Sequence, residues 1–190
     1  LLAIPMLVIA VMIKMDSKGP VFYRQERVTR YGKKFRIHKF RTMINNADQI
    51  GSAVTVGGDS RITKVGAKIR DYRLDELPQV FDVLSGDMSF VGTRPEVTKY
   101  VEKYSNEMLT TLLLPAGITS EASIRYKDEA KLLDAADDVD RVYVEKVLPG
   151  KMKYNLKSIK KFELAADIKT MFIGDRGYCS YNNMAHVIEK

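Results

Sequence analysis

Cysteine and histidine are scarce in this chain of 190 residues. Cys179 is the single cysteine, so the chain cannot form an internal disulfide framework. Only two histidines are present, and no pairing of Cys and His residues has the spacing of a zinc site. These absences argue against a disulfide-stabilised fold and against a zinc enzyme.

A hydrophobic run long enough to cross a bilayer is also missing. Residues 1–13 read LLAIPMLVIAVMI and carry no charge, but a spanning helix needs about 20 apolar residues. The run is not typical of a signal peptide, because no basic segment precedes it and no small-residue cleavage site follows it. We expect residues 1–15 to be part of a longer hydrophobic helix that associates with a membrane.

Pro5 lies inside this hydrophobic run and has two interpretations. A proline within a helix removes a backbone hydrogen bond and kinks the helix. A proline in the first turn causes no such break, and the segment would then be a buried core helix. Lys14 and Lys18 follow at once and would meet lipid headgroups, which favours the membrane interpretation.

Acidic residues are too few to balance the basic ones, and the formal net charge is +7. Ten Lys and Arg residues stand against two acids between Lys14 and Arg41, and six lysines lie between Lys146 and Lys161. Such surfaces attract nucleic acid, anionic lipid or phosphorylated ligands. The sequence has neither the aromatic-rich signature of RNA-binding domains nor a basic groove-reading helix, so we expect no nucleic-acid partner.

With 45% hydrophobic and 29% charged residues, the composition is that of a globular domain. The sequence pattern predicts two short strands over residues 21–28 and 34–40, joined as a hairpin, and a buried strand over residues 88–91. Helical spacing predicts helices over residues 62–72, 77–84, 96–114 and 127–148. We predict an α+β fold: one mostly helical domain over residues 16–173 with a small β-hairpin or sheet, then a loose tail over residues 174–190.

The segment after the Pro149-Gly150 pair, which we expect to interrupt the helices, is amphipathic. Met152, Leu156 and Ile159 form an apolar stripe flanked by lysines, of which Lys151 is the first. Lysines beside an apolar face suit a membrane surface. A packed helix with a solvated lysine face explains the pattern equally well, and the sequence leaves both interpretations open.

The most informative stretch runs from Arg70 to Pro95. Asp75 and Glu76 are adjacent, and two neighbouring carboxylates repel each other unless cations compensate them. Arg70 precedes the pair and Arg94 follows it. Arginine binds phosphate through two hydrogen bonds, and magnesium takes one or two carboxylates plus phosphate oxygens. This set indicates phosphoryl chemistry, although acids in the first turn of a helix would also be explained by the helix dipole.

Four pieces of the chain carry a resemblance to a known family. A broken hydrophobic segment runs into KMDSKGPVFYRQERV, and FRIHKFRTM, RLDELPQVFDVLSGDMSFVG and TRPE follow in order. In these motifs the chain resembles the bacterial sugar transferases, which are monotopic phosphoglycosyl transferases. Two positions depart from the usual pattern: Thr93 replaces the first proline of a Pro-Arg-Pro motif, and Asp82 stands where asparagine is common.

The resemblance implies an enzyme that transfers a sugar 1-phosphate from a UDP-sugar to a polyprenyl phosphate and releases UMP. It implies that Asp75 attacks the phosphate and forms a covalent phosphosugar intermediate, and that Glu76, with Asp75, holds magnesium (Mg2+). The implied phosphate-binding residues are Lys39, Arg41, Arg70 and Arg94.

The resemblance also implies a location and a specificity region. The hydrophobic helix would be re-entrant, entering and leaving on one face, and would hold the catalytic domain, residues 16–173, on the cytoplasmic side of a bacterial plasma membrane. The segment from Ile118 to Tyr126 would lie near the sugar-nucleotide pocket. Which sugar is used, and in which oligomeric state, the sequence leaves open.

Two other function classes stay open on the residues alone. A non-catalytic peripheral membrane scaffold would bind anionic lipid through its lysines. A soluble metal-dependent phosphohydrolase would use the same carboxylates on water-soluble diphosphates.

Overall fold

The computed structural model describes residues 2–47, 50, 58–133, 138–160 and 167–171. Within these residues the chain combines many helices with two small sheets. The predicted mixture of helices and a small sheet is confirmed. The prediction for residues 174–190 lies outside the described residues.

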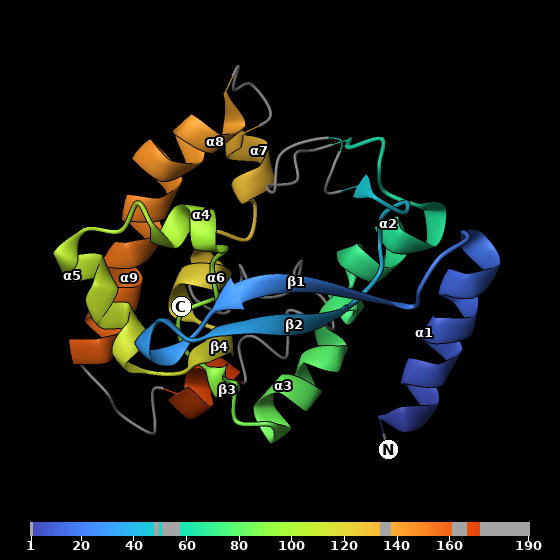
Figure 1. Cartoon of the computed structure of the whole chain (residues 1–190), viewed down its shortest axis with the longest axis horizontal. Coiled ribbons are helices and arrows are strands. Elements are labelled where there is room, and N and C mark those ends of the chain that lie inside the picture. Colours follow the sequence, from blue (N-terminus) through green and yellow to red (C-terminus); the bar gives the residue numbers. More distant parts are fainter. Residues whose placement is uncertain (1, 48–49, 51–57, 134–137, 161–166, 172–190) are drawn as a thin grey trace, which may run out of the picture.

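An antiparallel hairpin crosses the molecule between α1 at one end and the helices from α4 to α9 at the other (Figure 1). Its strands are β1, Phe22–Val28, and β2, Lys34–Phe40, and they pair from Phe22↔Phe40 to Val28↔Lys34. A short 3-10 turn, η1, Arg30–Gly32, joins them. Both strands and the hairpin were predicted from the sequence pattern, and both are confirmed.

The first helix, α1, Ala3–Asp16, places Pro5 in its first turn, where a missing N–H breaks no helical hydrogen bond. Ile9 and Ile13 pack against Phe40 and Ile69. Leu2, just before α1, is exposed, and so are most other large apolar side chains of the helix: Ile4, Leu7, Val8, Val11, Met12 and Met15. None of the described helices has the length and hydrophobicity to cross a bilayer. The re-entrant arrangement therefore stays a prediction.

Three consecutive helical elements follow the hairpin: α2, Lys64–Asp71, η3, Leu74–Gln79, and α3, Val80–Leu84. The side chain of Thr63 caps α2, and Asp16 at the end of α1 accepts a hydrogen bond from the Val65 backbone N–H. Arg73 adopts a left-handed backbone (φ 52°) that turns the chain from α2 into η3. This arrangement brings the acidic pair beside β2.

A second sheet forms from strands that are far apart in the sequence. β3, Met88–Val91, pairs in parallel with β4, Ala116–Thr119. The expected helix over 96–114 is divided into α4, Thr98–Val101, α5, Asn106–Leu109, and the 3-10 turn η4, Thr110–Leu113. β3 was predicted, but its partner was not, because parallel pairing leaves no short-range signal.

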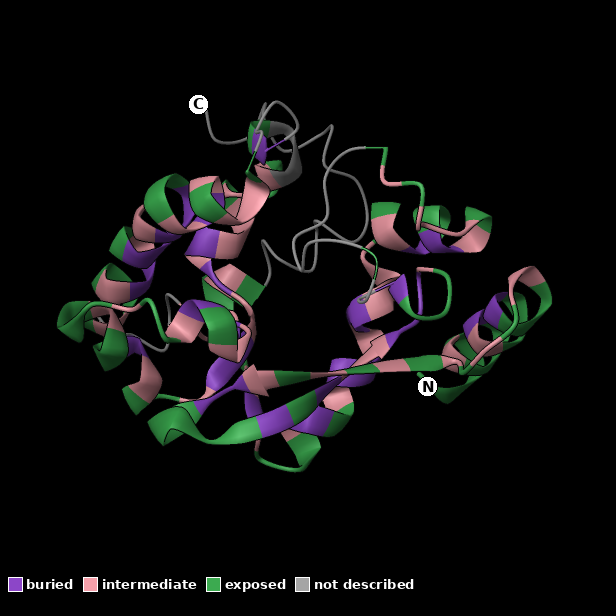
Figure 2. Cartoon of the chain, turned by 45° about the horizontal axis from the view of Figure 1, so that its top comes forward, coloured by how far each residue is buried: buried purple, intermediate pink, exposed green. Residues whose placement is uncertain are grey.

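The C-terminal helices build the largest core. They are α6, Glu121–Arg125, α7, Glu129–Leu133, α8, Val139–Val142, the π-helical turn η5, Tyr143–Val147, and α9, Leu148–Lys160. Their buried centre consists of Tyr100, Leu133, Tyr143, Val147, Leu148 and Met152. Figure 2 shows buried residues gathered inside these helices, whereas much of α1 is exposed.

One prediction for this region is wrong, and one of the lysines left open between two interpretations is neither solvated nor at a membrane surface. Pro149 and Gly150 do not interrupt the helices, because they lie in the first turn of α9, directly after the π-helical turn. Lys151 is not a solvated lysine, because its side chain is buried and paired with Glu129. Met152 faces the core, so the first turn of α9 is a packed element; Lys153, Lys157 and Lys160 are exposed.

Gly66 gives a test of how closely α2 packs on the chain after β2. A Cβ at this position would lie 2.1 Å from the carbonyl oxygen of Thr42. Gly→Ala within a helix normally stabilises by up to about 1 kcal/mol. We expect Gly66→Ala instead to destabilise by about 1–3 kcal/mol, because overpacking forces the backbones apart.

Denaturant unfolding measures this difference. The neighbouring exposed Ala67 supplies the control, because Ala67→Gly should cost only the helix propensity, about 0.5–1 kcal/mol. A Gly66→Ala variant more stable than the parent would contradict the close approach.

Candidate functional site

The acidic pair lies in the first turn of η3, as expected for a helix start, although the helix is 3-10 rather than α. Pro78 follows within the same element and cannot donate a backbone hydrogen bond. Both carboxylates line a large cavity, but Glu76 is buried whereas Asp75 is partly exposed. Two adjacent carboxylates thus occupy different surroundings.

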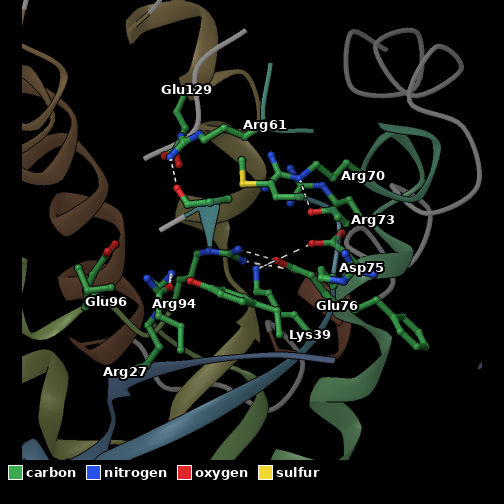
Figure 3. A pocket seen from close by; sticks show the side chains of 18 of the residues that line it. Arg27, Lys39, Arg61, Arg70, Arg73, Asp75, Glu76, Arg94, Glu96 and Glu129 are labelled. Carbon is green, nitrogen blue, oxygen red and sulfur yellow. Dashed lines mark hydrogen bonds and ion pairs between the residues drawn. The ribbon is translucent and has the colours of Figure 1, made fainter. Parts of the chain in front are cut away.

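Glu76 is held by two cations from different parts of the chain. Lys39 on β2 donates to Oε1 of Glu76 over 2.8 Å, and Arg94, in the loop after β3, donates to both carboxylate oxygens through its Nη2 and Nη1 atoms. Figure 3 shows the three side chains pointing toward one another. The carbonyl of Thr93 accepts from the Gly117 backbone N–H, so β4 anchors the turn that aims Arg94.

The charges of this trio depend on one another. Burial alone would raise the pKa of Glu76, but the charges of Arg94 and Lys39 outweigh it and hold that pKa well below its ordinary value. The charge of Glu76 raises the pKa of Arg94. Burial lowers the pKa of Lys39, and Glu76 opposes that effect. Glu76 is therefore ionised at neutral pH.

Asp75 differs from its neighbour in its electrostatics. Its carboxylate lies 4.0 Å from Nζ of Lys39. Burial raises the pKa of Asp75 above its ordinary value, opposed by the charges of Lys39 and Arg70. A carboxylate with a raised pKa that faces a cavity has the properties of a nucleophile or a general base.

The remaining predicted phosphate-binding residues divide into two cases. Arg70 lines the cavity and donates from Nε to the hydroxyl of Thr42 over 2.9 Å. Arg41 also lines the cavity, but its guanidinium donates to the carbonyls of Pro20, Lys18 and Ser17.

His38 and Asp82 connect the strand that carries Lys39 to the helix after the acidic pair. Asp82 is buried, and its carboxylate accepts from the backbone N–H of His38 over 2.9 Å and lies 2.6 Å from Nδ1 of the same residue. Asparagine is common at this position in the resembling family, and here the carboxylate of Asp82 has His38 as its hydrogen-bond partner.

The acidic pair opens into a cavity of about 1330 Å³. Its lining includes the hairpin, α2 and η3 at one end and residues of α4, α7, α8 and α9 at the other. None of residues 118–126 lines it, whereas Lys127 and Glu129 do. The expected pocket segment therefore ends next to the cavity lining and contributes no residue to it.

Sequence reasoning missed a further group of polar residues that line this cavity. They are Arg27, Glu96, Glu129, Tyr143 and Lys151. No local signal distinguished Lys151 from the other lysines around it, because its carboxylate partners lie far away in the sequence. Arg27 stood in a motif of the resemblance but had no assigned role.

The described residues contain no group of three or more His, Cys, Asp or Glu side chains placed to hold a metal ion. Magnesium rarely needs such a group, because it binds one or two carboxylates and completes its shell with water and substrate phosphate. Asp75 and Glu76 supply two adjacent carboxylates beside an open cavity. This donor set fits magnesium.

Comparisons with known proteins agree with the motifs. Residues 1–174 match the family model described as bacterial sugar transferase. The chain is 38% identical over 170 residues to UDP-N-acetylgalactosamine-undecaprenyl-phosphate N-acetylgalactosaminephosphotransferase of Aeromonas hydrophila, a match that covers 88% of this chain and 37% of that protein.

Two further relatives differ in length. The chain is 42% identical over 132 residues to a putative undecaprenyl-phosphate N-acetylgalactosaminyl 1-phosphate transferase of Bacillus subtilis, covering 68% of this chain and 72% of that protein. It is 34% identical over 174 residues to UDP-glucose:undecaprenyl-phosphate glucose-1-phosphate transferase of Xanthomonas campestris, a match that covers 88% of this chain and 33% of that protein. The chain thus spans about a third of the length of the Aeromonas and Xanthomonas proteins.

The unequal surroundings of the two acids predict opposite effects on stability. Glu76→Gln should destabilise by about 3 kcal/mol near neutral pH, because it leaves Lys39 and Arg94 buried without their counter-ion. Asp75→Asn should be neutral or stabilising, because it removes a carboxylate whose ionisation burial disfavours.

Thermal unfolding at a series of pH values checks both statements. Because folding raises the pKa of Asp75, this residue favours the folded state most below its ordinary pKa of 3.8, where it is protonated in both states. That contribution to stability is lost as the pH rises through the pKa of Asp75 in the folded protein. Any advantage of Asp75→Asn should therefore be full above that folded-state pKa and shrink toward pH 3.8. A large loss of stability in Asp75→Asn at neutral pH would contradict the assignment.

Proposed function

The chain belongs to the bacterial sugar transferase family, and on this basis we propose that it transfers a sugar 1-phosphate from a UDP-sugar to a polyprenyl phosphate and releases UMP. Relatives named as undecaprenyl-phosphate sugar phosphate transferases support the general reaction. The observation that carries the proposal is the acidic pair, which faces a cavity and is surrounded by Lys39, Arg70 and Arg94.

The proposed reaction has two displacements at one phosphorus atom. A carboxylate oxygen of Asp75 attacks the phosphate that bears the sugar, the bond to the UMP oxygen breaks, and UMP leaves. An oxygen of the polyprenyl phosphate then attacks the phosphosugar–enzyme intermediate, and the Asp75 carboxylate is released. The raised pKa of Asp75 supports this role, because a more basic carboxylate is a stronger nucleophile.

The cations around the pair are proposed to stabilise the transferring phosphoryl group. Phosphoryl transfer depends chiefly on positioning and on neutralising charge on the phosphate oxygens. Lys39 and Arg94 are fixed by Glu76, so they need not reorganise when charge develops. Arg70, held by Thr42, would contact the same diphosphate.

Magnesium would be held by Glu76 together with Asp75. When bound, it would neutralise charge on the donor diphosphate. Glu76 also orders Lys39 and Arg94, so its carboxylate has two roles: it keeps the cations in place and it supplies oxygen to the metal.

The lipid acceptor fits the position of α1. Its exposed apolar side chains, such as Ile4 at 75% and Met15 at 83%, would enter the lipid boundary. Pro20 and Phe22, just beyond this helix, line the same cavity as Asp75. We therefore propose a monotopic protein on the cytoplasmic face of a bacterial plasma membrane.

An assay of the purified protein in detergent tests the proposal directly. Polyprenyl phosphate and a panel of UDP-sugars are supplied with magnesium, and released UMP is measured. Release with at least one UDP-sugar supports the enzyme. Liposome binding that survives loss of both carboxylates, with no UMP from any donor, would instead support a peripheral membrane scaffold.

The nucleophile is tested by Asp75→Asn. We expect UMP release to fall by at least about 10³-fold, while the folded state persists. Intact-mass measurement of the parent protein with a UDP-sugar, without lipid acceptor, should reveal an added phosphosugar that is absent from the variant. Normal transfer by Asp75→Asn would exclude the covalent role.

The metal assignment is tested by Glu76→Gln. Little activity should remain, and the dependence of rate on magnesium concentration should weaken, because one carboxylate ligand is lost and the cations are released. Substitution of the exposed Glu107 by Gln serves as the control, and the rate of this variant should depend on magnesium concentration as in the parent. A magnesium response unchanged in Glu76→Gln would count against its role as a ligand.

A further inference from the structure

The far end of the cavity carries a connected group of polar side chains that the proposed chemistry does not use. We name Glu96, Glu129, Tyr143 and Lys151 the distal polar cluster; all four line the same cavity as Asp75. They come from the loop before α4, from α7, from the π-helical turn and from α9. A polar network that spans so many elements and borders a cavity is a candidate binding site.

Lys151 is the centre of this cluster. Its side chain is only 5% exposed, and its Nζ donates to Oε2 of Glu129 over 3.1 Å and to the hydroxyl of Tyr143 over 3.0 Å. The Tyr143 hydroxyl donates in turn to Oε1 of Glu96 over 2.6 Å. Because a buried ammonium is stable only when it is paired and hydrogen-bonded, Lys151 fixes the position of the Glu129 carboxylate.

Local backbone features build this arrangement. Tyr143 begins the π-helical turn, a geometry that is frequent at functional sites. A Cβ on Gly150 would lie 2.0 Å from the Tyr126 hydroxyl, so only glycine lets Tyr126 pack against the start of α9. This contact fixes the chain just before Glu129 against the helix that carries Lys151.

Glu129 differs from the other carboxylate of the cluster in its access to the cavity. Glu96 is buried, whereas the Glu129 side chain is 32% exposed. An ionised carboxylate offers about four acceptor sites, so the bond from Lys151 leaves acceptor capacity toward the cavity. Glu129 also lies near enough to Arg94 for its charge to raise the pKa of that arginine.

The charge of the cluster determines which ligand chemistry it fits. The carboxylates of Glu96 and Glu129 surround the ammonium of Lys151, and the partly buried Arg27 lies near enough to Glu96 to lower the pKa of that carboxyl. Two acids and two cations therefore balance here, and the cluster has no excess positive charge to attract a phosphate. The cations Lys39, Arg70 and Arg94 at the acidic pair supply that attraction. A carboxylate in a fixed position with free acceptor sites fits an uncharged ligand rich in hydroxyl donors.

We propose that Glu129, positioned by Lys151, binds adjacent hydroxyls of a sugar ring of the nucleotide-sugar donor. This inference rests on the proposed function for the identity of the donor. A UDP-sugar has two such rings, the transferred sugar and the ribose, and they share this chemistry.

The test compares the parent protein with Glu129→Gln by calorimetric binding of UDP-sugar and of UMP, which requires no turnover. We expect the variant to bind UDP-sugar about tenfold more weakly, the effect of losing a hydrogen bond to a charged group. The exposed Glu102→Gln is the matched control and should bind like the parent.

The UMP measurement distinguishes the two rings. If Glu129 binds the ribose, affinity for UMP falls with that for UDP-sugar, and the parent discriminates against 2′-deoxy- or 3′-deoxy-UMP while the variant does not. If Glu129 binds the transferred sugar, the affinity for UMP is unchanged in the variant. The parent then discriminates against UDP-sugars that lack a hydroxyl on the transferred sugar, and the variant does not.

The proposal is overturned if Glu129→Gln binds both UDP-sugar and UMP as tightly as the parent. If its thermal midpoint falls, Glu129→Asp is used instead, because it keeps the charge beside Lys151 but shortens the side chain by one C–C bond, about 1.5 Å. That variant should fold and still lose affinity; full affinity in it also overturns the proposal. Absence of UMP release in the parent is a different result, which would refute the proposed function alone.

Discussion

The buried carboxylate of Glu76 is the interaction on which the site depends. It accepts hydrogen bonds from Lys39 on β2 and from Arg94 after β3, and all three side chains lie largely away from solvent. Moving one such ion out of water costs several kcal/mol, so each is tolerated only in the presence of the others. The hairpin, η3 and the second sheet are therefore held at one point by charge as well as by packing.

This arrangement separates the properties of two neighbours in the chain. Glu76 lies against Lys39 and Arg94, which keep it ionised, whereas Asp75 faces the cavity with a raised pKa. Environments that push two pKa values apart allow one carboxylate to organise charge while the other reacts. In the proposed reaction, Glu76 fixes the cations and Asp75 meets the phosphate.

The cavity connects regions of different chemistry. The apolar surface of α1 lies near one end, beside Pro20 and Phe22, and the acidic pair follows with its cations. The distal polar cluster borders the other end. This order suits a ligand with hydroxyl groups, a diphosphate and a lipid partner, because each part meets side chains of matching polarity. The large C-terminal core supports the distal polar cluster, and the hairpin supports the acidic pair and its cations.

The sequence alone determined what local spacing controls. The residue pattern located both hairpin strands, helical spacing located α2, and adjacency in the motif marked Asp75 and Glu76. Only the tertiary structure decided which charges meet. It assigned Arg41 to backbone carbonyls, buried Lys151 against Glu129 and paired β3 with a strand far along the chain. The reason is physical: whether a lysine or an arginine is solvated or buried depends on partners that folding brings from distant positions, and no residue type or period encodes them.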